Sequence, residues 1–398
     1  MKRILFFSKI SLWSMDKNKG APSFYRTVKG YVDDGWDVTL IMPETDHSIN
    51  GVEGVRVLSY SLPFHNLCNH KKTGFLFKLF NTLSAYSAMY HIGKKQIQSR
   101  GTSLLYAYEV HGVKPAKKLS RRYHLPLVTR FQGTILAAKE YTLLNRIRYY
   151  PHFSALHESA DITIMTDDGT LGDKVLERAG NHSKNIFFWK NGVDLPKKSP
   201  YSEEIQKLKD KYHIRPEDSI LLTVSRLASW KRVDRAIKAL DTVIQRGKQC
   251  CLVIVGDGDS RKELEELVNR LNLEGYVHFA GAVAHDEVYS YMNMADIFLS
   301  LYDLSNVGNP LLEALSCGKP VITLDVGDTS SVIQNDVNGV LLDINALNRV
   351  PEAIMELLDN PDYASRLGQA AKEYASQNFW SWNERIAAEM RVVDRLIV

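Results

Sequence analysis

The sequence predicts an α/β protein built from two Rossmann-like, doubly wound domains of similar size. Short apolar runs alternate with amphipathic helical patterns through both halves of the chain. The runs are continuously apolar, which is typical of strands that are buried on both faces in a parallel sheet. At 398 residues the chain is long enough to form two domains with full cores. We therefore expect two such domains facing each other across a cleft, a common place for a ligand.

The first half begins with a strand–helix–strand unit. RILFFS (3–8) is the first buried strand, PSFYRTVKGYVDDG (22–35) a helix that ends at a glycine, and WDVTLIMP (36–43) the next strand. Gly20 precedes this helix, at a place where backbone without a Cβ can approach a phosphate closely. The full G-x-G-x-x-G pattern is absent, so a plain turn is the alternative, and a dinucleotide-dependent dehydrogenase is disfavoured.

The rest of the first half continues the alternation. Strands are expected at 103–110, 125–134, 160–170 and 185–194, and helices at 64–100, 113–123 and 172–180. Three polar side chains, Glu109, His111 and Gln132, follow strand ends, where open α/β sheets place their ligands. They are candidates for a ligand site of the first domain.

Basic and aromatic residues gather in two stretches of this half. Residues 64–100 carry Phe, Leu and Tyr at helical spacing beside lysine pairs, and RIRYY (146–150) is a second cluster. One interpretation is a surface that contacts an anionic membrane. The other is an ordinary core-packed helix with a basic flank, which we favour because an aromatic stripe is more often core.

The charge of the chain is divided unevenly. Residues 1–193 carry 27 Lys and Arg against 15 Asp and Glu, whereas the remaining 205 residues carry 23 against 31, so charges of +12 and −8 give the net +4. A basic first half indicates an anionic partner: a phosphate-bearing acceptor, a membrane surface or nucleic acid. Solvated lysines are the alternative. No RNA- or DNA-binding motif supports nucleic acid.

Composition restricts the location of the protein. The contents of 44% hydrophobic and 24% charged residues are those of an ordinary globular protein, and the four cysteines lack metal-ligand spacing. The first apolar run is too short for a signal peptide, and no stretch approaches the roughly 20 apolar residues of a membrane span. We expect a cytoplasmic protein, with peripheral contact to the inner face of the membrane as the variant that the basic clusters suggest.

The boundary between the domains is expected in a polar, proline-containing stretch near 194–202, which gives domains at 1–193 and 194–379. Strands follow at 219–227, 250–258, 276–281, 295–300 and 320–326, and helices at 232–247, 260–273, 286–295 and 310–318. NGVLLD (338–343) is expected to be a loop, followed by two helical segments. The amphipathic segment 380–398 is expected to pack across a surface.

The most informative stretch is SLYDLSNVGNPLLEALSCGKPVITLDVG (300–327). A turn-rich loop enters a helix that has Pro310 in its first turn. Unpaired N–H groups at this helix start, together with the helix dipole, favour a phosphate. The groups in question belong to Asn309, Leu311 and Leu312. One turn further on, Glu313 can reach a pair of ribose hydroxyls.

Three other loops of the second half also follow strands. Arg226 and Lys231 lie five residues apart across a strand–helix turn, and two cations there can neutralise a diphosphate. Gly256 permits close backbone approach, and the strand that begins at Val277 offers an edge that can pair with a base. Each of these four features is common on its own, but their occurrence in this order on one domain is hard to explain by chance.

At this point the chain resembles the family 4 retaining glycosyltransferases of the GT-B fold. The matching pieces are NGVD (191–194), SRL (225–227) with Lys231, VGDG (255–258), VHFAG (277–281), PLLEA (310–314), CG (317–318) and PVI (320–322). The resemblance implies a GT-B fold whose C-terminal helix, 380–398, crosses back to the N-terminal domain. It implies an acceptor-binding first domain and a second domain that binds a nucleotide-sugar, a substrate rather than a cofactor; no metal is expected.

The resemblance also implies roles for single residues. Arg226 and Lys231 would grip the donor diphosphate as catalytic residues, Glu313 the ribose, Val277 the base and Gly20 a phosphate. The sugar would lie near Ser305, Asn306 and Gly308, and the helix start at Asn309, Pro310, Leu311 and Leu312 would complete the donor site. Glu109, His111 and Gln132 would lie on the acceptor side. The implied reaction transfers a sugar, with UDP favoured over GDP as its carrier, to a glycan or lipid-linked acceptor in cell-surface polysaccharide synthesis.

Two positions depart from the family pattern. The family carries Glu, seven residues, then Glu, but here Ser305 occupies the first position. The family's active-site histidine is replaced by Gln132, which cannot titrate but can hydrogen-bond a sugar hydroxyl and is therefore kept as a catalytic candidate. A front-face mechanism, in which the leaving phosphate deprotonates the acceptor, tolerates both changes because it needs charge stabilisation and positioning. The alternatives are a catalytically weakened nucleotide-sugar-binding paralogue and a nucleotide-sugar 2-epimerase of the same fold.

Overall fold

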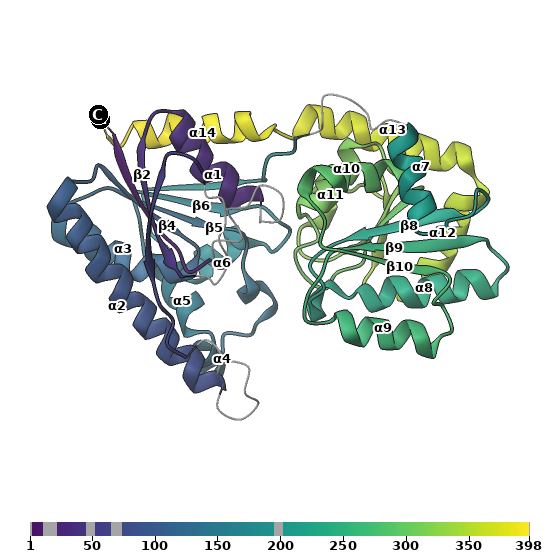
Figure 1. Cartoon of the computed structure of the whole chain (residues 1–398), viewed down its shortest axis with the longest axis horizontal. Helices are drawn as coiled ribbons and strands as arrows, with labels where there is room; N and C mark the ends of the chain where they lie inside the picture. The colour runs from purple at the N-terminus through teal and green to yellow at the C-terminus, as the bar shows by residue number, and fades with distance from the viewer. Residues whose placement is uncertain (1, 11–21, 45–51, 65–73, 195–201, 398) are drawn as a thin grey trace. The chain divides into compact units, whose positions relative to one another are not determined.

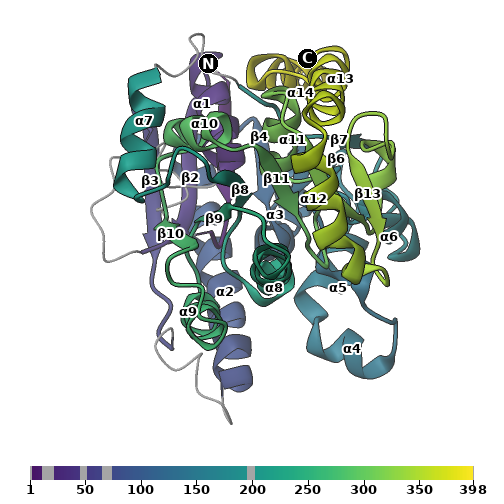
Figure 2. The ribbon, with the colours of Figure 1, turned by 90° about the vertical axis from the view of Figure 1, so that its right-hand side faces the viewer.

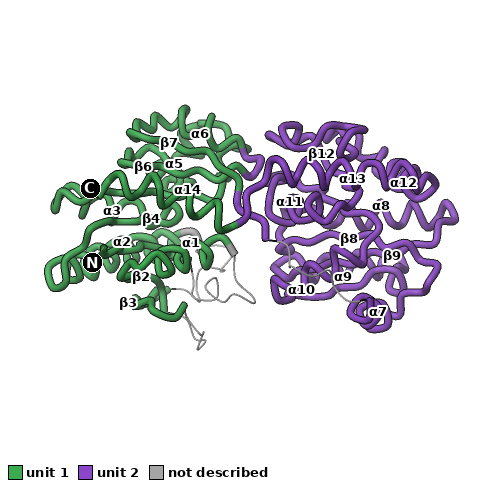
Figure 3. Tube along the Cα trace, turned by 90° about the horizontal axis from the view of Figure 1, so that it is seen from above, with its two compact units in different colours: residues 1–167, 171–190, 382–398 green, residues 168–170, 191–381 purple. Residues whose placement is uncertain are grey.

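The chain folds into two compact units (Figure 3). The computed structural model describes residues 2–10, 22–44, 52–64, 74–194 and 202–397. Unit 1 comprises Met1–Asp167, Leu171–Lys190 and Trp382–Val398, and unit 2 comprises Asp168–Thr170 and Asn191–Ser381. The chain passes from one unit to the other after residues 190 and 381, where the sequence predicted 193 and 379. The assignment of Asp168–Thr170 to unit 2 was not predicted.

Unit 1 is built on a seven-stranded sheet in the order β3-β2-β1-β4-β5-β6-β7, and every neighbouring pair is parallel. Its strands are β1 (Arg3–Phe7), β2 (Asp37–Pro43), β3 (Val55–Tyr60), β4 (Leu104–Tyr108), β5 (Leu127–Phe131), β6 (Ile162–Thr166) and β7 (Asn185–Trp189). Its helices are α1 (Pro22–Asp33), α2 (Gly74–Arg100), α3 (Val110–Tyr123), α4 (Leu143–Arg148), α5 (Tyr150–His157), α6 (Gly172–Arg178) and α14 (Trp382–Asp394) (Figure 1).

Helices cover both faces of this sheet because successive strand residues point to opposite sides. In β1, Leu5 and Phe7 belong to the core shared with α2, α3 and α5, whereas Ile4 and Phe6 belong to the core shared with α1 and α14. Figure 1 shows the same division, with α1 and α14 above the sheet and α2, α3 and α5 below it. This burial on both faces of the sheet explains why the strand sequences are continuously apolar.

Unit 2 has a six-stranded sheet in the order β10-β9-β8-β11-β12-β13, in which all neighbouring strands are parallel. Its strands are β8 (Ser219–Val224), β9 (Cys250–Val255), β10 (Val277–Gly281), β11 (Ile297–Ser300), β12 (Val321–Asp325) and β13 (Val340–Asp343). Its helices are α7 (Ser202–Lys211), α8 (Val233–Gln245), α9 (Arg261–Arg270), α10 (His285–Met294), α11 (Asn309–Ser316), α12 (Val350–Asp359) and α13 (Pro361–Asn378).

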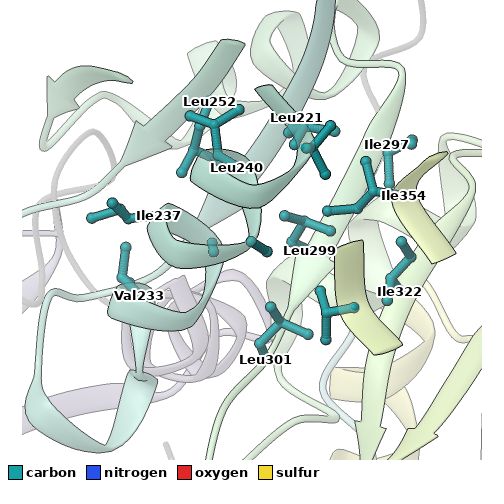
Figure 4. Close-up of a cluster of buried hydrophobic side chains, with 14 of the residues drawn as sticks. Leu221, Val233, Ile237, Leu240, Leu252, Ile297, Leu299, Leu301, Ile322 and Ile354 are labelled. Atoms are coloured by element: carbon teal, nitrogen blue, oxygen red, sulfur yellow. The ribbon is translucent and has the colours of Figure 1, made fainter. Parts of the chain in front are cut away.

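The core of unit 2 is likewise double. Figure 4 shows the first half, in which Leu240 of α8 and Ile354 of α12 pack against Leu252 and Ile322 of the sheet. The second half lies on the opposite face, under α10, α11 and α13. Both ribbon views place α8 and α9 on one side of the sheet and α10 and α11 on the other (Figures 1 and 2).

Two edge strands were missed by the sequence analysis. NGVLLD, predicted to be a loop, contains β13, which pairs with β12. Residues 55–60 form β3, which pairs with β2 and is mostly exposed or half-buried. A short edge strand has one neighbour and one partly solvated face, so its sequence carries a weaker apolar signal than a central strand.

The C-terminal helix α14 belongs to unit 1, as the sequence predicted for segment 380–398. It carries a fully buried carboxylate, Glu389, which pairs with Arg130 of β5 at 3.1 Å and with Arg385 at 3.2 Å. The hydroxyl of Tyr106 donates to the same carboxylate at 2.7 Å. Because a buried charge is tolerated only with such partners, this network fixes how α14 lies on the unit 1 sheet.

Candidate functional site

The carboxyl edge of the unit 2 sheet gathers the charged and glycine-rich loops that the sequence singled out. All six strands are parallel, so the segments that follow β8, β9 and β11 leave the sheet on the same edge. Arg226 and Lys231 follow β8, Gly256 follows β9, and the loop 301–308 leads from β11 into α11. The parallel topology is the reason why residues 70 or more positions apart meet here.

Lys231 lies at the centre of this edge. Its Nζ donates to the carbonyl oxygen of Ser305 at 3.1 Å and lies 4.2 Å from the centroid of the Tyr302 ring. The pKa of the Lys231 ammonium is lowered to about 8, mainly by burial; Asp168 acts to raise it, and the neighbouring Arg226 acts to lower it. The result is a largely desolvated cation whose interaction with an anion is strong because water screens it little.

Arg226 is exposed and has a preset orientation. Its guanidinium stacks over the ring of Trp230, with Cζ 4.9 Å from the ring centroid. Such a stacked guanidinium keeps its in-plane N–H groups available to a ligand, and Arg suits bidentate recognition of phosphate. Lys231 and Arg226 thus provide one half-buried and one exposed cation on the same strand–helix turn.

The start of α11 is formed as predicted, with Gly308 as its N-cap and Pro310 in the first turn. The prediction of three unpaired N–H groups was wrong for two of them. Leu311 and Leu312 both donate to the carbonyl oxygen of Gly308, at 3.0 and 3.3 Å, and their side chains lie in the core. The first turn is tightened, so of these three described groups only the Asn309 N–H is left for an anion.

Glu313, one turn into α11, is held by a residue that the sequence analysis did not select. Oε1 of Glu313 lies 3.0 Å from Nε2 of His285, at the start of α10. The carboxylate side chain is 12% exposed and the imidazole 28% exposed. The remaining carboxylate oxygen and the accessible edge of the pair suit a pair of ribose hydroxyls. His285 lies only four residues beyond the β10 strand, and this position at the carboxyl edge was the signal that could have identified it.

Asn306, predicted to lie near the donor sugar, is buried and hydrogen-bonded within its own loop. It is 1% exposed, and its Oδ1 accepts from the backbone N–H of Tyr302 at 3.2 Å and from the Ser300 hydroxyl at 3.4 Å. Its Nδ2 donates to the Tyr302 carbonyl at 3.1 Å. The amide therefore closes the loop on itself and does not reach the surface. Its neighbour Ser305 is half-buried, with backbone at φ +59.

The glycine of the β9 loop serves the packing of the sheet rather than a phosphate. A Cβ on Gly256 would lie 1.9 Å from the carbonyl oxygen of Ser225, and φ at this residue is +128. The Gly256 N–H donates to Gly281 O at 2.8 Å. The predicted close approach is therefore correct, but the group that approaches is the backbone of the β8 loop.

Val277, predicted to frame the base, lies at the start of β10 and not at its carboxyl end. It is the first residue of β10, pairs with Leu252 and is buried in the core. The carboxyl end of this strand lies four residues further on, at Gly281, which is about 13 Å away at the usual rise of a strand. The motif VHFAG was found correctly, but its ligand-facing end is the last residue and not the first.

The segment Asp168–Thr170 was missed as part of this site. The backbone carbonyl of Asp168 accepts from Val307 N–H at 3.1 Å, and that of Gly169 accepts from Asp328 N–H at 3.2 Å. A Cβ on Gly327 would lie 1.9 Å from the Gly169 carbonyl oxygen. A tripeptide from the first half of the sequence is thus packed against the loop after β11, a tertiary contact without a sequence signal.

Unit 1 brings two of its three candidates together. Glu109 is the N-cap of α3 and accepts, through Oε1, the backbone N–H of Gln132 at 2.7 Å. Its own backbone is in a strained conformation, with φ +66, which is uncommon for a residue with a Cβ. β4 and β5 are neighbours, so their carboxyl ends place these two polar residues side by side.

His111, the second residue of α3, is half-buried, and its imidazole is neutral at pH 7. Burial lowers its pKa to about 3, and the charges of Lys9 and His152 act in the same direction. Its Nδ1 is buried and has no hydrogen-bond partner among the described residues. Such an orphaned atom suits a ligand hydroxyl, so His111 keeps its place among the acceptor-side candidates.

Two further expectations concern ligands. Gly20, the predicted phosphate contact of the first domain, lies outside the described residues. In the described part of the chain, no three His, Cys, Asp or Glu residues are grouped so that they could hold a metal ion. Metal independence stays a prediction.

No described helix combines the length and apolar composition needed to cross a bilayer.

Comparison with known proteins finds a family that part of the second half of the chain resembles. Residues 204–374 match the family model for glycosyl transferases group 1. This part of the chain is therefore similar to the glycosyl transferases of group 1. The matched stretch contains all of the described unit 2 site except Asp168–Thr170.

Among curated proteins, the chain is 29% identical over 206 residues to a GDP-mannose-dependent alpha-(1-6)-phosphatidylinositol monomannoside mannosyltransferase of Mycobacterium tuberculosis, which is 50% of this chain and 53% of that protein. It is 28% identical over 193 residues to the N-acetyl-alpha-D-glucosaminyl L-malate synthase of Bacillus anthracis, which is 48% of this chain and 49% of that protein. The chain thus spans about half the length of these curated relatives.

Solved structures match nearly the whole chain. Sucrose-phosphate synthase from Thermosynechococcus elongatus aligns with a TM-score of 0.78 at 19% identity, covering 99% of this chain and 98% of that one. Anabaena HepE in complex with UDP-glucose aligns with a TM-score of 0.76 at 19% identity, covering 98% and 100%. These structures are GT-B glycosyltransferases, so the predicted GT-B fold is confirmed, while identities this low show the fold alone.

Proposed function

We propose that the chain is a retaining glycosyltransferase of family 4 that transfers a sugar from a nucleotide-sugar to a glycan or lipid-linked acceptor. The observation that carries this proposal is the pair Lys231 and Arg226 beside the α11 N-terminus, at the edge where Glu313 can hold a ribose. Two cations, a helix dipole and a carboxylate match a nucleoside diphosphate, the part that all nucleotide-sugars share.

The reaction proposed for this site breaks the bond between the anomeric carbon and the diphosphate oxygen. The acceptor hydroxyl oxygen bonds to the same face of that carbon, and its proton goes to the departing phosphate. Lys231 and Arg226 would stabilise the charge that develops on the diphosphate, with no protein base and no metal ion needed. Glu109, His111 and Gln132 are the residues proposed to receive the acceptor on unit 1.

The nucleotide is proposed to be UDP, and the process to be cell-surface polysaccharide synthesis in the cytoplasm. The names of the relatives include a GDP-mannose-dependent enzyme, and one neighbouring structure contains UDP-glucose. Thermal-shift measurements with UDP, GDP and ADP test the base directly, because a ligand that binds only the folded state raises the melting temperature. A larger shift with GDP than with UDP would overturn the choice of uridine.

The transfer itself is tested with the donor selected in that way and a panel of glycan and lipid-linked acceptors. We expect Arg226→Ala and Lys231→Ala each to lower kcat/KM by about 10²-fold, the usual cost of a lost charge-stabilising group. Wild-type rates in both variants would refute the site. Product NMR shows whether the anomeric configuration is retained, and EDTA shows whether a metal is needed.

The two alternative functions proposed from the sequence differ from sugar transfer in the substrates that they convert. A nucleotide-sugar-binding paralogue would bind the donor without turnover. A 2-epimerase would convert the donor without any acceptor. Incubating the protein with the donor alone and with the acceptor therefore separates all three, and product that depends on the acceptor is expected.

A membrane contact of unit 1 is a separate proposal. Leu143, Leu144 and Ile147 of α4 are 76, 74 and 59% exposed, and Leu76 and Phe80 of α2 are both 53% exposed. α4 also carries two arginines, and neither helix contains an acidic residue. Exposed apolar side chains beside basic ones match the apolar and anionic layers of a lipid surface. This observation favours the membrane-facing interpretation that the sequence analysis had ranked second.

A further inference from the structure

Asp303, in the loop between β11 and α11, contacts both chain neighbours of Lys231. Its backbone N–H donates to the carbonyl oxygen of Trp230 at 3.0 Å, and its Oδ2 accepts from Nη1 of Arg232 at 3.3 Å. Trp230 precedes Lys231 in the sequence and Arg232 follows it. One residue of the loop therefore holds the turn that carries this lysine on both sides of it.

The other oxygen of the Asp303 carboxylate is held from α8. Oδ1 lies 2.6 Å from Nη2 of Arg235, in the first turn of that helix. Nη1 of Arg235 donates to the carbonyl oxygen of Leu301 at 2.8 Å, and the Arg235 side chain is only 10% exposed. A guanidinium with so little contact to water needs acceptors of this kind, because burying an unpaired charge is costly. These contacts fasten the loop 301–303 to the start of α8.

The turn before α8 has a backbone that depends on its surroundings. Arg232 is at φ +46, a left-handed conformation that is uncommon for a residue with a Cβ. Such a conformation persists where the contacts around it hold it in place. The Arg232 guanidinium bonds to both oxygens of Asp234, at 2.9 and 3.1 Å, and to Asp303. Of these two carboxylates, Asp303 is the one that links the turn to the loop before α11.

Both cations of the candidate site depend on this turn. Nζ of Lys231 donates to the carbonyl oxygen of Ser305 at 3.1 Å, two residues beyond Asp303. The Arg226 guanidinium stacks on the ring of Trp230, whose carbonyl oxygen accepts from Asp303. A turn that moved away from the loop would therefore carry Lys231 away from the place where a phosphate is proposed to bind.

We propose that Asp303 is a positioning residue for the diphosphate of the donor: it pins the turn 230–232 to the loop before α11 and so places Lys231. This inference rests on the proposed function of the unit 2 site. It also gives a role to the single acidic residue in the sequence of the loop 301–308.

The sign of the effect separates this role from plain electrostatics. Asp303 carries a negative charge at the edge where a diphosphate is proposed to bind, and like charges repel. If only its charge mattered, a neutral residue at position 303 would strengthen the binding of an anion. If Asp303 places Lys231, the same substitution weakens that binding.

The test measures the binding of inorganic pyrophosphate, and of UDP, to the full chain at pH 7. Asp303→Asn is expected to weaken binding about fivefold or more. Its melting temperature is expected to change little, because the Asp303 side chain is 41% exposed and such ion pairs contribute little to stability. Unchanged or tighter binding would overturn the proposal. Asp325→Asn is the matched control: it neutralises an exposed carboxylate at the end of β12, and its binding is expected to be unchanged or slightly tighter.

A double-mutant cycle tests whether Asp303 acts through Lys231. In a Lys231→Ala background the weakening caused by Asp303→Asn is expected to be much smaller than in the wild-type protein, because the group that it positions is gone. An equal weakening in both backgrounds would contradict the proposal.

A conservative substitution separates positioning from folding. Asp303→Glu keeps the charge that pairs with Arg232 and Arg235, so it is expected to bind pyrophosphate more tightly than Asp303→Asn. Binding no better than that of Asp303→Asn, at equal melting temperature, would count against the proposal. If the wild-type protein binds neither pyrophosphate nor UDP, the proposed function fails, and the role of Asp303 fails with it.

Discussion

Glu313 and His285 form a partly buried pair, with Oε1 and Nε2 3.0 Å apart, that joins the second turn of α11 to the start of α10 in unit 2. The pair combines one residue that the sequence selected with one that it did not. If Glu313 accepts the hydroxyls of a ribose, His285 limits the orientations that this carboxylate can take before the ligand arrives.

Glu313→Ala is expected to weaken nucleotide binding by roughly 10- to 100-fold, since hydrogen bonds to a charged group contribute about 1.5–3 kcal/mol. His285→Ala is expected to have a smaller effect in the same direction, because it frees the carboxylate without removing it. Isothermal titration with the nucleoside diphosphate measures both. Inorganic pyrophosphate serves as the control ligand: it has no ribose, so its affinity should not change.

The alkaline limit of donor binding should follow Lys231. Its pKa is lowered to about 8, and only the protonated form can neutralise a phosphate. Thus kcat/KM, which reports the free enzyme, is expected to be nearly constant below about pH 7 and to fall as the pH rises through 8. Lys231→Arg should remove this limb, because a guanidinium stays protonated throughout. A limb that persists in Lys231→Arg would mean that another group titrates.

Gly256→Ala should destabilise unit 2 by more than about 2 kcal/mol, because the new Cβ would meet the Ser225 carbonyl at 1.9 Å in a backbone conformation at φ +128. Gly275→Ala is the matched control: nothing lies within 4 Å of its Cβ position, and its φ is not positive. Thermal and urea unfolding measure both variants. If Gly256→Ala and Gly275→Ala were equally stable, the loops after β8 and β9 would be less closely packed than in this structure.

His111 should make the stability of unit 1 depend on pH. Its pKa is lowered to about 3 in the folded chain, against roughly 6.5 when unfolded, so between these values the unfolded state binds more protons. The contribution of His111 to the free energy of unfolding is fully present above pH 6.5. It decreases as the pH falls, by about 2 kcal/mol at pH 5. Urea unfolding at pH 7 and pH 5 should show a smaller loss for His111→Gln than for the wild-type protein.

The α4 surface is tested with lipid vesicles. Leu143→Ser combined with Leu144→Ser should reduce sedimentation with vesicles of anionic lipid at least severalfold, because it removes the two most exposed of the large apolar side chains described. Vesicles of neutral lipid report the apolar contribution alone. Leu83→Ser is the comparison on α2, where a 52% exposed leucine faces solvent. Unchanged binding of the α4 variant would remove this helix from the contact.

Local sequence was sufficient to predict much of this protein. The apolar runs gave most of the strands and the two-unit α/β organisation, because burial on both faces of a parallel sheet leaves a continuous signal. Pro310 and the glycines around it located the start of α11 to within a residue, since those residue types favour specific backbone conformations. Arg226, Lys231 and Glu313 followed from their places after strands.

Tertiary structure decided what these residues touch. Val277 and Gly281 are the two ends of β10, and the sheet shows that Gly281 lies at its carboxyl edge. Asn306 points inward because its amide makes hydrogen bonds to the backbone of its own loop. Asp168 and His285 could not be found from spacing, since each meets its partner through a contact between separate segments. The Asp168 carbonyl oxygen accepts from the N–H of Val307, 139 positions away, and His285 lies 28 positions from Glu313. Sequence fixes local conformation, whereas the packing of parallel strands brings distant charges to a common edge, and that packing completes the candidate site.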